Sequence, residues 1–139
     1  MCIIPKYTNS FYFTSLPQIL YVGHDLSLLE FLRNIVAVCR ITRCPIGSIA
    51  RLFIRDINYS LILLDEELPD ANGLELAHFA RSLKYHEQTP IIVLSDMEYD
   101  VEVILCKPND FQLVARAIMY LLDIQLGRKE KGSSNHFHR

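Results

Sequence analysis

The chain is organised around residues 61–76, which have the sequence LILLDEELPDANGLEL. Residues 61–64 are consecutive aliphatic residues, and such a run predicts a strand that is buried on both faces, as parallel strands between two helix layers are. The run stops at Asp65, the turn PDANG follows, and apolar residues then return at helical spacing. In open α/β sheets the ligand crevice lies at the carboxyl ends of the strands, so Asp65 is expected to face it.

The rest of the chain alternates between the same two patterns. Apolar runs predict further strands at residues 18–22, 40–44, 90–94 and 101–106. Helical spacing predicts helices over residues 25–40, 47–57 and 74–85. A last helix is predicted between a cap, at Asn109 or Asp110, and Gly127. Alternating strands and helices imply right-handed crossovers and a doubly wound parallel sheet.

The composition is that of one globular domain. Half of the 139 residues are hydrophobic, which is enough for one core, while the length is short for two domains. The net charge of −2 gives no positive field to attract nucleic acid or an anionic membrane, and no apolar run reaches membrane-spanning length. Most of the four cysteines lie in apolar segments without zinc-site spacing, so a reduced, cytoplasmic protein is expected.

The stretch LILLDEELPDANGLEL resembles the phospho-acceptor strand and loop of the response-regulator receiver family, with Asp65 at the acceptor position. Lys107, in the motif CKP, matches the family's lysine, and Ser95, after the fourth predicted strand, matches its serine or threonine. The family positions that shape the loops of the pocket are matched by Pro69, Gly73 and Pro108. The resemblance covers residues 18–123 and implies a flavodoxin-like α/β fold, whose five-stranded parallel sheet has the order 2-1-3-4-5.

In receivers, the acceptor aspartate takes a phosphoryl group from a phosphohistidine of a kinase and forms an aspartyl phosphate. Charge gathers on the equatorial oxygens of the transferred group, so a divalent metal ion, a lysine and a hydroxyl group are needed around it. By resemblance, Asp65 is the phospho-acceptor, and Ser95 and Lys107 contact the phosphoryl group and sense its charge. The resemblance implies a signalling protein of a two-component system or phosphorelay rather than an enzyme.

Two departures from the family pattern bear on this interpretation. Where receivers carry two acidic residues after the first strand to hold Mg²⁺, this chain has Gly23 and His24. Mg²⁺ prefers oxygen ligands in octahedral geometry, whereas a neutral imidazole suits softer metals. Asp25 follows, but it can equally cap the first helix, and Glu67 occupies a place whose backbone carbonyl is used in the family. No cofactor is expected unless Asp25, Asp65 and Glu67 rebuild a Mg²⁺ site.

The second departure is a short connection before the fifth predicted strand. Residues 96–102, DMEYDVE, separate Ser95 from Val103, where receivers usually place a whole helix. When extended, such a segment reaches roughly 23–25 Å, which can return the chain along one strand but cannot also wind several helical turns. The fourth helix is therefore expected to be deleted or replaced by a loop. The position of the family's switch aromatic residue, three before Lys107, is occupied by Ile104.

These departures favour a degenerate receiver that signals by binding other proteins, with weak or absent phosphorylation at Asp65. Asp65 and Lys107 are then expected to form a permanent ion pair. The alternative is a working receiver that is phosphorylated by a histidine kinase, because acceptor, hydroxyl group and lysine are all present. A small α/β enzyme or nucleotide binder is a third hypothesis, although no glycine-rich phosphate loop follows the first strand and no nucleophile–base pair is evident.

The expected organisation is an N-terminal arm at residues 1–17, a receiver-like domain at 18–126 and a polar, flexible tail at 127–139. Without a fourth helix, the apolar fourth and fifth strands should leave part of the sheet uncovered, at a cost of about 25 cal/mol per Å². The aromatic arm or a second molecule is expected to cover that surface. The partners expected are therefore proteins, namely a histidine kinase, a downstream signalling protein or a second copy of this chain.

Overall fold

The structure, a computed structural model of the chain, describes residues 16–36, 38–99 and 103–125. Its strands are β1 (Gln18–Val22), β2 (Arg40–Cys44), β3 (Leu61–Asp65), β4 (Ile91–Leu94) and β5 (Ile104–Cys106). They form one parallel sheet in the order β2-β1-β3-β4-β5, which confirms the predicted order. The carboxyl ends of all these strands therefore lie along one edge of the sheet.

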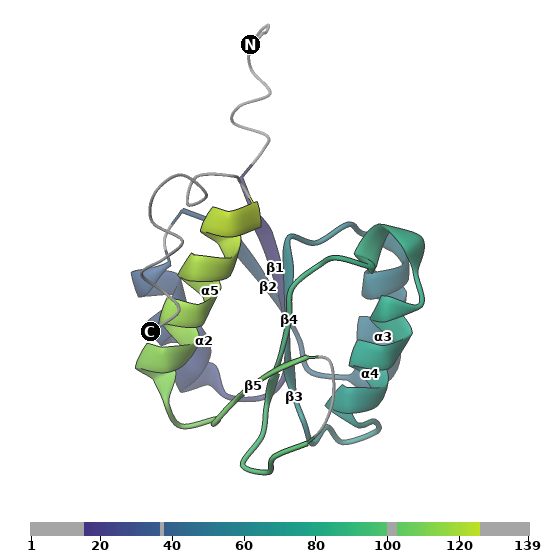
Figure 1. Cartoon of the computed structure of the whole chain (residues 1–139). Helices are drawn as coiled ribbons and strands as arrows, with labels where there is room; N and C mark the ends of the chain where they lie inside the picture. Colours follow the sequence, from purple (N-terminus) through teal and green to yellow (C-terminus); the bar gives the residue numbers. More distant parts are fainter. Residues whose placement is uncertain (1–15, 37, 100–102, 126–139) are drawn as a thin grey trace, which may run out of the picture.

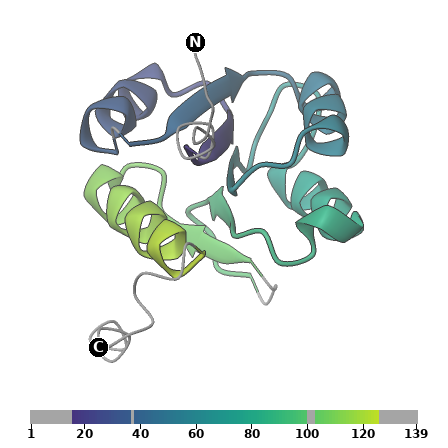
Figure 2. The same cartoon turned by 90° about the horizontal axis from the view of Figure 1, so that it is seen from above.

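The helices lie in two layers, one on each side of the sheet. They are α2 (Leu26–Ile35), α3 (Gly47–Asp56), α4 (Gly73–Arg81), the short 3-10 helix η1 (Lys84–His86) and α5 (Phe111–Gln125). Helices α2 and α5 cover one face, and α3 and α4 cover the other (Figure 1). The view from above shows the sheet between these two pairs (Figure 2). Among the described helices, none is long and apolar enough to span a membrane.

Strand β3 explains why the centre of the sheet is apolar on both faces. Leu61 and Leu63 pack in the core beneath α2 and α5, whereas Ile62 and Leu64 pack in the core beneath α3 and α4. All four side chains are fully buried. Each such burial contributes about 1.5–3 kcal/mol, so β3 is firmly held and fixes the position of Asp65 at its end.

The helix predicted over residues 25–40 is shorter than expected and spans Leu26–Ile35. Asp25 is its N-cap, since Asp25 Oδ1 accepts a hydrogen bond from the backbone N–H of Leu28 at 3.0 Å. The helix ends where Val36 leaves the helical conformation, and the chain then turns into β2. Asp25 is therefore used for capping.

Two later boundaries are also clarified by the structure. The helix predicted over residues 74–85 ends at Arg81, and η1 follows it as a separate turn. Of the two candidate caps of the last helix, Asp110 is used, because its Oδ1 accepts a hydrogen bond from the backbone N–H of Leu113 at 3.2 Å.

The connection between β4 and β5 has no helix in its described residues, 95–99 and 103, in agreement with the predicted loss of the fourth helix. The uncovered apolar face is smaller than expected, because α4 packs against β4 and every residue of β4 is buried. Exposure occurs at β5 instead, where Val103 and Leu105 are partly buried and Ile104 is 38% exposed. The predicted tail and nearly all of the predicted arm lie outside the described residues.

Candidate functional site

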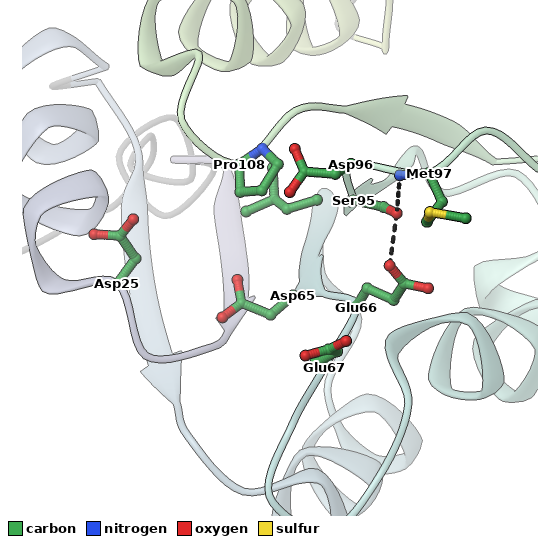
Figure 3. Close-up of a pocket in the computed structure, with 9 residues that line it drawn as sticks. Asp25, Asp65, Glu66, Glu67, Ser95, Asp96, Met97 and Pro108 are labelled. Carbon is green, nitrogen blue, oxygen red and sulfur yellow. Dashed lines mark hydrogen bonds between the residues drawn. The ribbon is translucent and has the colours of Figure 1, made fainter.

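An open pocket of about 380 Å³ lies at the carboxyl edge of the sheet. Its wall includes Asp65 from β3, Ser95 after β4 and Pro108 after β5 (Figure 3). The pocket is acidic, and the carboxylates that line it are Asp25, Asp65, Glu66, Glu67 and Asp96. None of the described residues in its lining is basic. The pocket thus presents negative charge where the sequence predicts a phosphoryl site.

Both oxygens of the Asp65 carboxylate accept hydrogen bonds from β1 and its exit turn. Oδ1 accepts one from the Tyr21 hydroxyl group at 2.9 Å, and Oδ2 accepts one from the backbone N–H of His24 at 3.1 Å. Tyr21 is fully buried, and its hydroxyl oxygen in turn accepts a hydrogen bond from the backbone N–H of Asp25 at 3.1 Å. The neighbouring strands β1 and β3, with Tyr21 paired to Leu63, bring these groups together. Asp65, the predicted phospho-acceptor, is therefore held by hydrogen bonds from β1 and from the turn that follows it.

Burial governs the protonation of this pair. It raises the pKa of Asp65 above its usual value, while the hydrogen bonds from His24 and Tyr21 act in the opposite direction. Burial also raises the pKa of Tyr21, and the charge of Asp65 adds to that rise. Tyr21 is consequently a neutral donor at physiological pH, so it gives Asp65 a hydrogen bond but no positive charge.

Ser95 is engaged by a second carboxylate. Ser95 is buried, and its hydroxyl group donates to Glu66 Oε1 at 2.6 Å and accepts from the backbone N–H of Met97 at 2.9 Å (Figure 3). The other oxygen of Glu66 accepts a hydrogen bond from the Tyr99 hydroxyl group. The bonds from Ser95 and Tyr99 lower the pKa of Glu66, with Ser95 as the larger cause. The Ser95 hydroxyl group therefore already has both a donor and an acceptor partner inside the chain.

The loop after β3 is held by close packing and by α3. A Cβ atom at Gly73 would lie 2.2 Å from the backbone carbonyl oxygen of Asp65, so only glycine fits there. Asp70 accepts hydrogen bonds from the backbone N–H groups of Gly47 at 2.8 Å and Ser48 at 3.0 Å, in the first turn of α3. The remaining residues expected to shape the loops lie in the turn after β3 and in the pocket wall, and they are Pro69 and Pro108.

The groups around Asp65 do not fit a Mg²⁺ ion. A Cβ atom at Gly23 would lie 2.5 Å from Asp65 Cγ and Oδ2 and from the Tyr21 hydroxyl oxygen, so this position has no room for an acidic side chain. Asp25 caps α2, and Glu67 is exposed. Within the described ranges, no group of three or more histidine, cysteine, aspartate or glutamate side chains is arranged to hold a metal ion. The donor set therefore lacks the converging oxygens that Mg²⁺ requires.

Neither a protein-family model nor a curated protein matches the sequence, but the structure is similar to solved receiver domains. The receiver domain of the Francisella response regulator 1452 matches with a TM-score of 0.65 and 21% identity, over 78% of this chain and 98% of that one. The chemotaxis response regulator CheY4 of Vibrio cholerae matches with a TM-score of 0.65 and 16% identity, over 77% and 99%. The chain has the receiver-domain fold.

A third similar structure is the receiver domain of the sensor histidine kinase PA1611 from Pseudomonas aeruginosa PAO1. It matches with a TM-score of 0.64 and 22% identity, over 76% of this chain and 97% of that one. That receiver domain has a magnesium ion coordinated in its active-site cleft. In the present chain, the described donors beside Asp65 do not suit such an ion.

The ion pair predicted between Asp65 and Lys107 is not formed in this receiver fold. Lys107 is exposed, and the salt bridge found among the described residues joins Arg55 to Asp56 instead. Asp65 is held instead by β1 and its exit turn, which donate one hydrogen bond to each of its oxygens. At the predicted switch position, Ile104 lies on β5 with its side chain partly exposed.

Tyr21 is the site residue that the sequence analysis missed. It lies within the apolar run QILYV, where an aromatic residue is expected simply to fill the core. Its hydroxyl group was the available signal, because a buried tyrosine hydroxyl needs a hydrogen-bond partner and the run offers none. The contacts of Glu66 were also not predicted. The spacing of residues along the chain gave no sign that Glu66 would accept hydrogen bonds from both Ser95 and Tyr99.

Proposed function

We propose that this chain is a signalling protein of the receiver family that acts by binding other proteins, with weak or no phosphorylation at Asp65. The observation that supports this most directly is the engagement of both Asp65 oxygens by Tyr21 and His24. The Ser95 hydroxyl group, which would contact a phosphoryl group, is likewise bonded to Glu66. A phosphoryl group on Asp65 would have to break these bonds and would then face an acidic pocket without a cation.

The proposed activity is recognition rather than catalysis. The receiver fold is similar to domains of response regulators and of a sensor histidine kinase, so the partners we propose are a histidine kinase or a downstream signalling protein in the cytoplasm. A Mg²⁺ cofactor is not part of the proposal, because Asp65 and Tyr21 occupy the space that an acidic side chain at residue 23 would need. The signal would then be carried by association, not by an aspartyl phosphate.

A working phospho-receiver is the second candidate. It is favoured by the placement of Asp65 and Ser95 in one pocket, with Lys107 next to Pro108 of the pocket wall. For this candidate to hold, Tyr21 and Glu66 would have to release their partners when a phosphodonor and Mg²⁺ arrive. The two candidates therefore make opposite predictions for the same measurement.

The deciding experiment is to incubate the full chain with acetyl phosphate and Mg²⁺ and to weigh the intact protein by mass spectrometry. Asp65→Asn is the matched control, because it removes the acceptor while keeping the size of the side chain. A working receiver treated in the same way shows that the phosphodonor is active. We expect no adduct above that of the Asp65→Asn protein. A stoichiometric phosphoryl adduct that is lost in Asp65→Asn would contradict the proposal and support the second candidate.

We further propose that the partly exposed surface at β5 contributes to association, either with a partner protein or with a second copy of the chain. Its support is the exposure of Ile104 on β5 and the partial exposure of Val103 and Leu105, which pack on the side of the sheet that α3 and α4 cover. Deleting residues 1–16 should lower the melting temperature or change the mass measured by light scattering, since the arm is expected to help cover this surface. Equal stability of the two chains, with both monomeric at high concentration, would rule this surface out as an interface.

A further inference from the structure

On the side of Asp65 that faces β1, the Tyr21 hydroxyl group lies within hydrogen-bond distance of the carboxylate. The Tyr21 hydroxyl donates to Asp65 Oδ1 at 2.9 Å and accepts from the backbone N–H of Asp25 at 3.1 Å, so its hydrogen and one of its lone pairs are both used. The Tyr21 ring is fully buried in the core beneath α2 and α5 and cannot swing away without opening that core. The hydroxyl group is therefore a fixed part of the site.

Gly23 makes this arrangement possible. A Cβ atom at residue 23 would lie 2.5 Å from the Tyr21 hydroxyl oxygen and equally close to Asp65 Cγ and Oδ2. Any side chain at residue 23 would thus collide with both partners of the hydrogen bond. The tyrosine at 21 and the glycine at 23 therefore depend on each other, and together they fix the position of the Asp65 carboxylate.

We propose that Tyr21 is a positioning residue that replaces a divalent cation at this site. It holds the Asp65 carboxylate through a hydrogen bond to Oδ1, an oxygen that a cation would otherwise bind, and so it keeps this side chain in one position without metal. This inference deepens the proposed function, because a neutral hydroxyl group in place of a cation supplies no positive charge to stabilise a phosphoryl group. It also means that restoring acidic residues at positions 23 and 24 cannot by itself restore a metal site.

The test compares two variants that differ by a single oxygen atom. In the double variant Gly23→Asp/His24→Asp, the two acids are restored but the Tyr21 hydroxyl remains. In the triple variant Tyr21→Phe/Gly23→Asp/His24→Asp, the hydroxyl is removed, so Asp65 is released from it and can turn away from the new side chain. Wild type and Tyr21→Phe serve as controls without the acids. Binding of Mn²⁺ is measured from the paramagnetic broadening of the Asp65 and Glu66 amide signals in NMR spectra.

We expect the triple variant to bind Mn²⁺ at least about tenfold more tightly than the double variant, because groups next to a metal ligand typically change affinity by that factor or more. A purely structural role for Tyr21 would not produce a gain of binding when its hydroxyl group is removed. Equal affinities in the two variants, including no binding by either, would overturn the inference.

A second measurement covers the case in which the combined variants do not fold. In Tyr21→Phe alone, the backbone N–H of Asp25 loses its acceptor and Asp65 loses one of its two donors. Hydrogen exchange at Asp25 and His24 should therefore become roughly three- to tenfold faster, while exchange at Ile62 within β3 stays unchanged. Unchanged exchange at Asp25 and His24 would show that Tyr21 does not hold the site.

The outcomes of these tests can be distinguished from a failure of the proposed function. Hydrogen exchange and Mn²⁺ binding are measured without a phosphodonor, so they report only on the role of Tyr21. A phosphoryl adduct on wild-type Asp65 would overturn the proposed function. Unchanged exchange in Tyr21→Phe would overturn this inference, while the Glu66–Ser95 bond and the acidic pocket would still argue against phosphorylation.

Discussion

Replacing Gly23 by alanine should disrupt the site with a single methyl group. The added carbon would lie 2.5 Å from the Asp65 carboxylate and from the Tyr21 hydroxyl oxygen, which is far inside van der Waals contact. Tyr21 is anchored in the core, so Asp65 is the group that must move. The hydrogen bonds that Asp65 accepts from Tyr21 and His24 would then be stretched or lost.

The size of the effect follows from these contacts. Forcing an extra methyl group into a packed site costs about 1–3 kcal/mol. Each lost hydrogen bond adds about 0.5–1.5 kcal/mol, and relaxation of the exposed side of Asp65 recovers part of the total. We expect Gly23→Ala to lower the free energy of unfolding by about 2–4 kcal/mol. That is a large share of the roughly 5–15 kcal/mol that stabilises a typical domain.

Urea unfolding followed by circular dichroism measures this change, and His24→Ala is the matched control. The His24 side chain is exposed and only its backbone N–H binds Asp65, so His24→Ala should change stability by less than about 0.5 kcal/mol. In a double-mutant cycle, Tyr21→Phe/Gly23→Ala should be less destabilised than the sum of the single variants, because Tyr21→Phe already removes one colliding atom. A Gly23→Ala protein as stable as wild type would refute the described packing around Asp65.

Three further predictions concern the surroundings of the site. Asp70→Ala should lower the melting temperature, because the backbone N–H groups in the first turn of α3 lose the carboxylate that accepts their hydrogen bonds. Asp56→Ala, at the exposed end of α3, is the control and should leave the melting temperature unchanged. Equal melting curves for the two variants would contradict the role of Asp70. Tyr99→Phe should raise the pKa of Glu66 toward its usual value, as measured by carboxyl NMR titration, and an unmoved pKa would mean that this bond is absent in solution. Burial lowers the pKa of His86 below 6.5, so near this pH the unfolded chain binds a proton at His86 more readily than the folded protein does. The free energy of unfolding should therefore fall as the pH drops below 6.5, and a flat profile in that range would exclude this effect.

Local runs of sequence were sufficient to predict the strands of the sheet, whereas their order was implied by the resemblance to receiver domains. Residues 61–64 predicted a buried strand from apolarity alone, and the short segment at residues 96–102 predicted the loss of a helix from its length. The same local reasoning placed Asp65 and Ser95 at neighbouring strand ends, and both line one pocket.

The contacts of the site could not be predicted in the same way. The bond between Tyr21 and Asp65 joins residues 44 positions apart, and it depends on the register of two strands and on the direction of two side chains. Charge alone suggested that Asp65 would pair with Lys107, but in the structure the carboxylate accepts its hydrogen bonds from a tyrosine hydroxyl group and a backbone N–H. Periodicity indicates which face a residue occupies, not which partner its polar atoms find.

The brief connection between β4 and β5 should also affect how the chain folds. Neighbouring parallel strands usually require a crossover of about a dozen residues or more, whereas residues 95–103 join this pair. Because these two strands are the nearest in sequence of the paired strands, their pairing adds the least to the contact order of the sheet. Closing the shorter loop between them also costs less conformational entropy. We expect it to form early relative to the pairing of β1 with β3, which spans a much longer stretch of chain. Early pairing would leave the free edge of β4 exposed for less time, and so would reduce the chance that another unfolded chain adds a strand there.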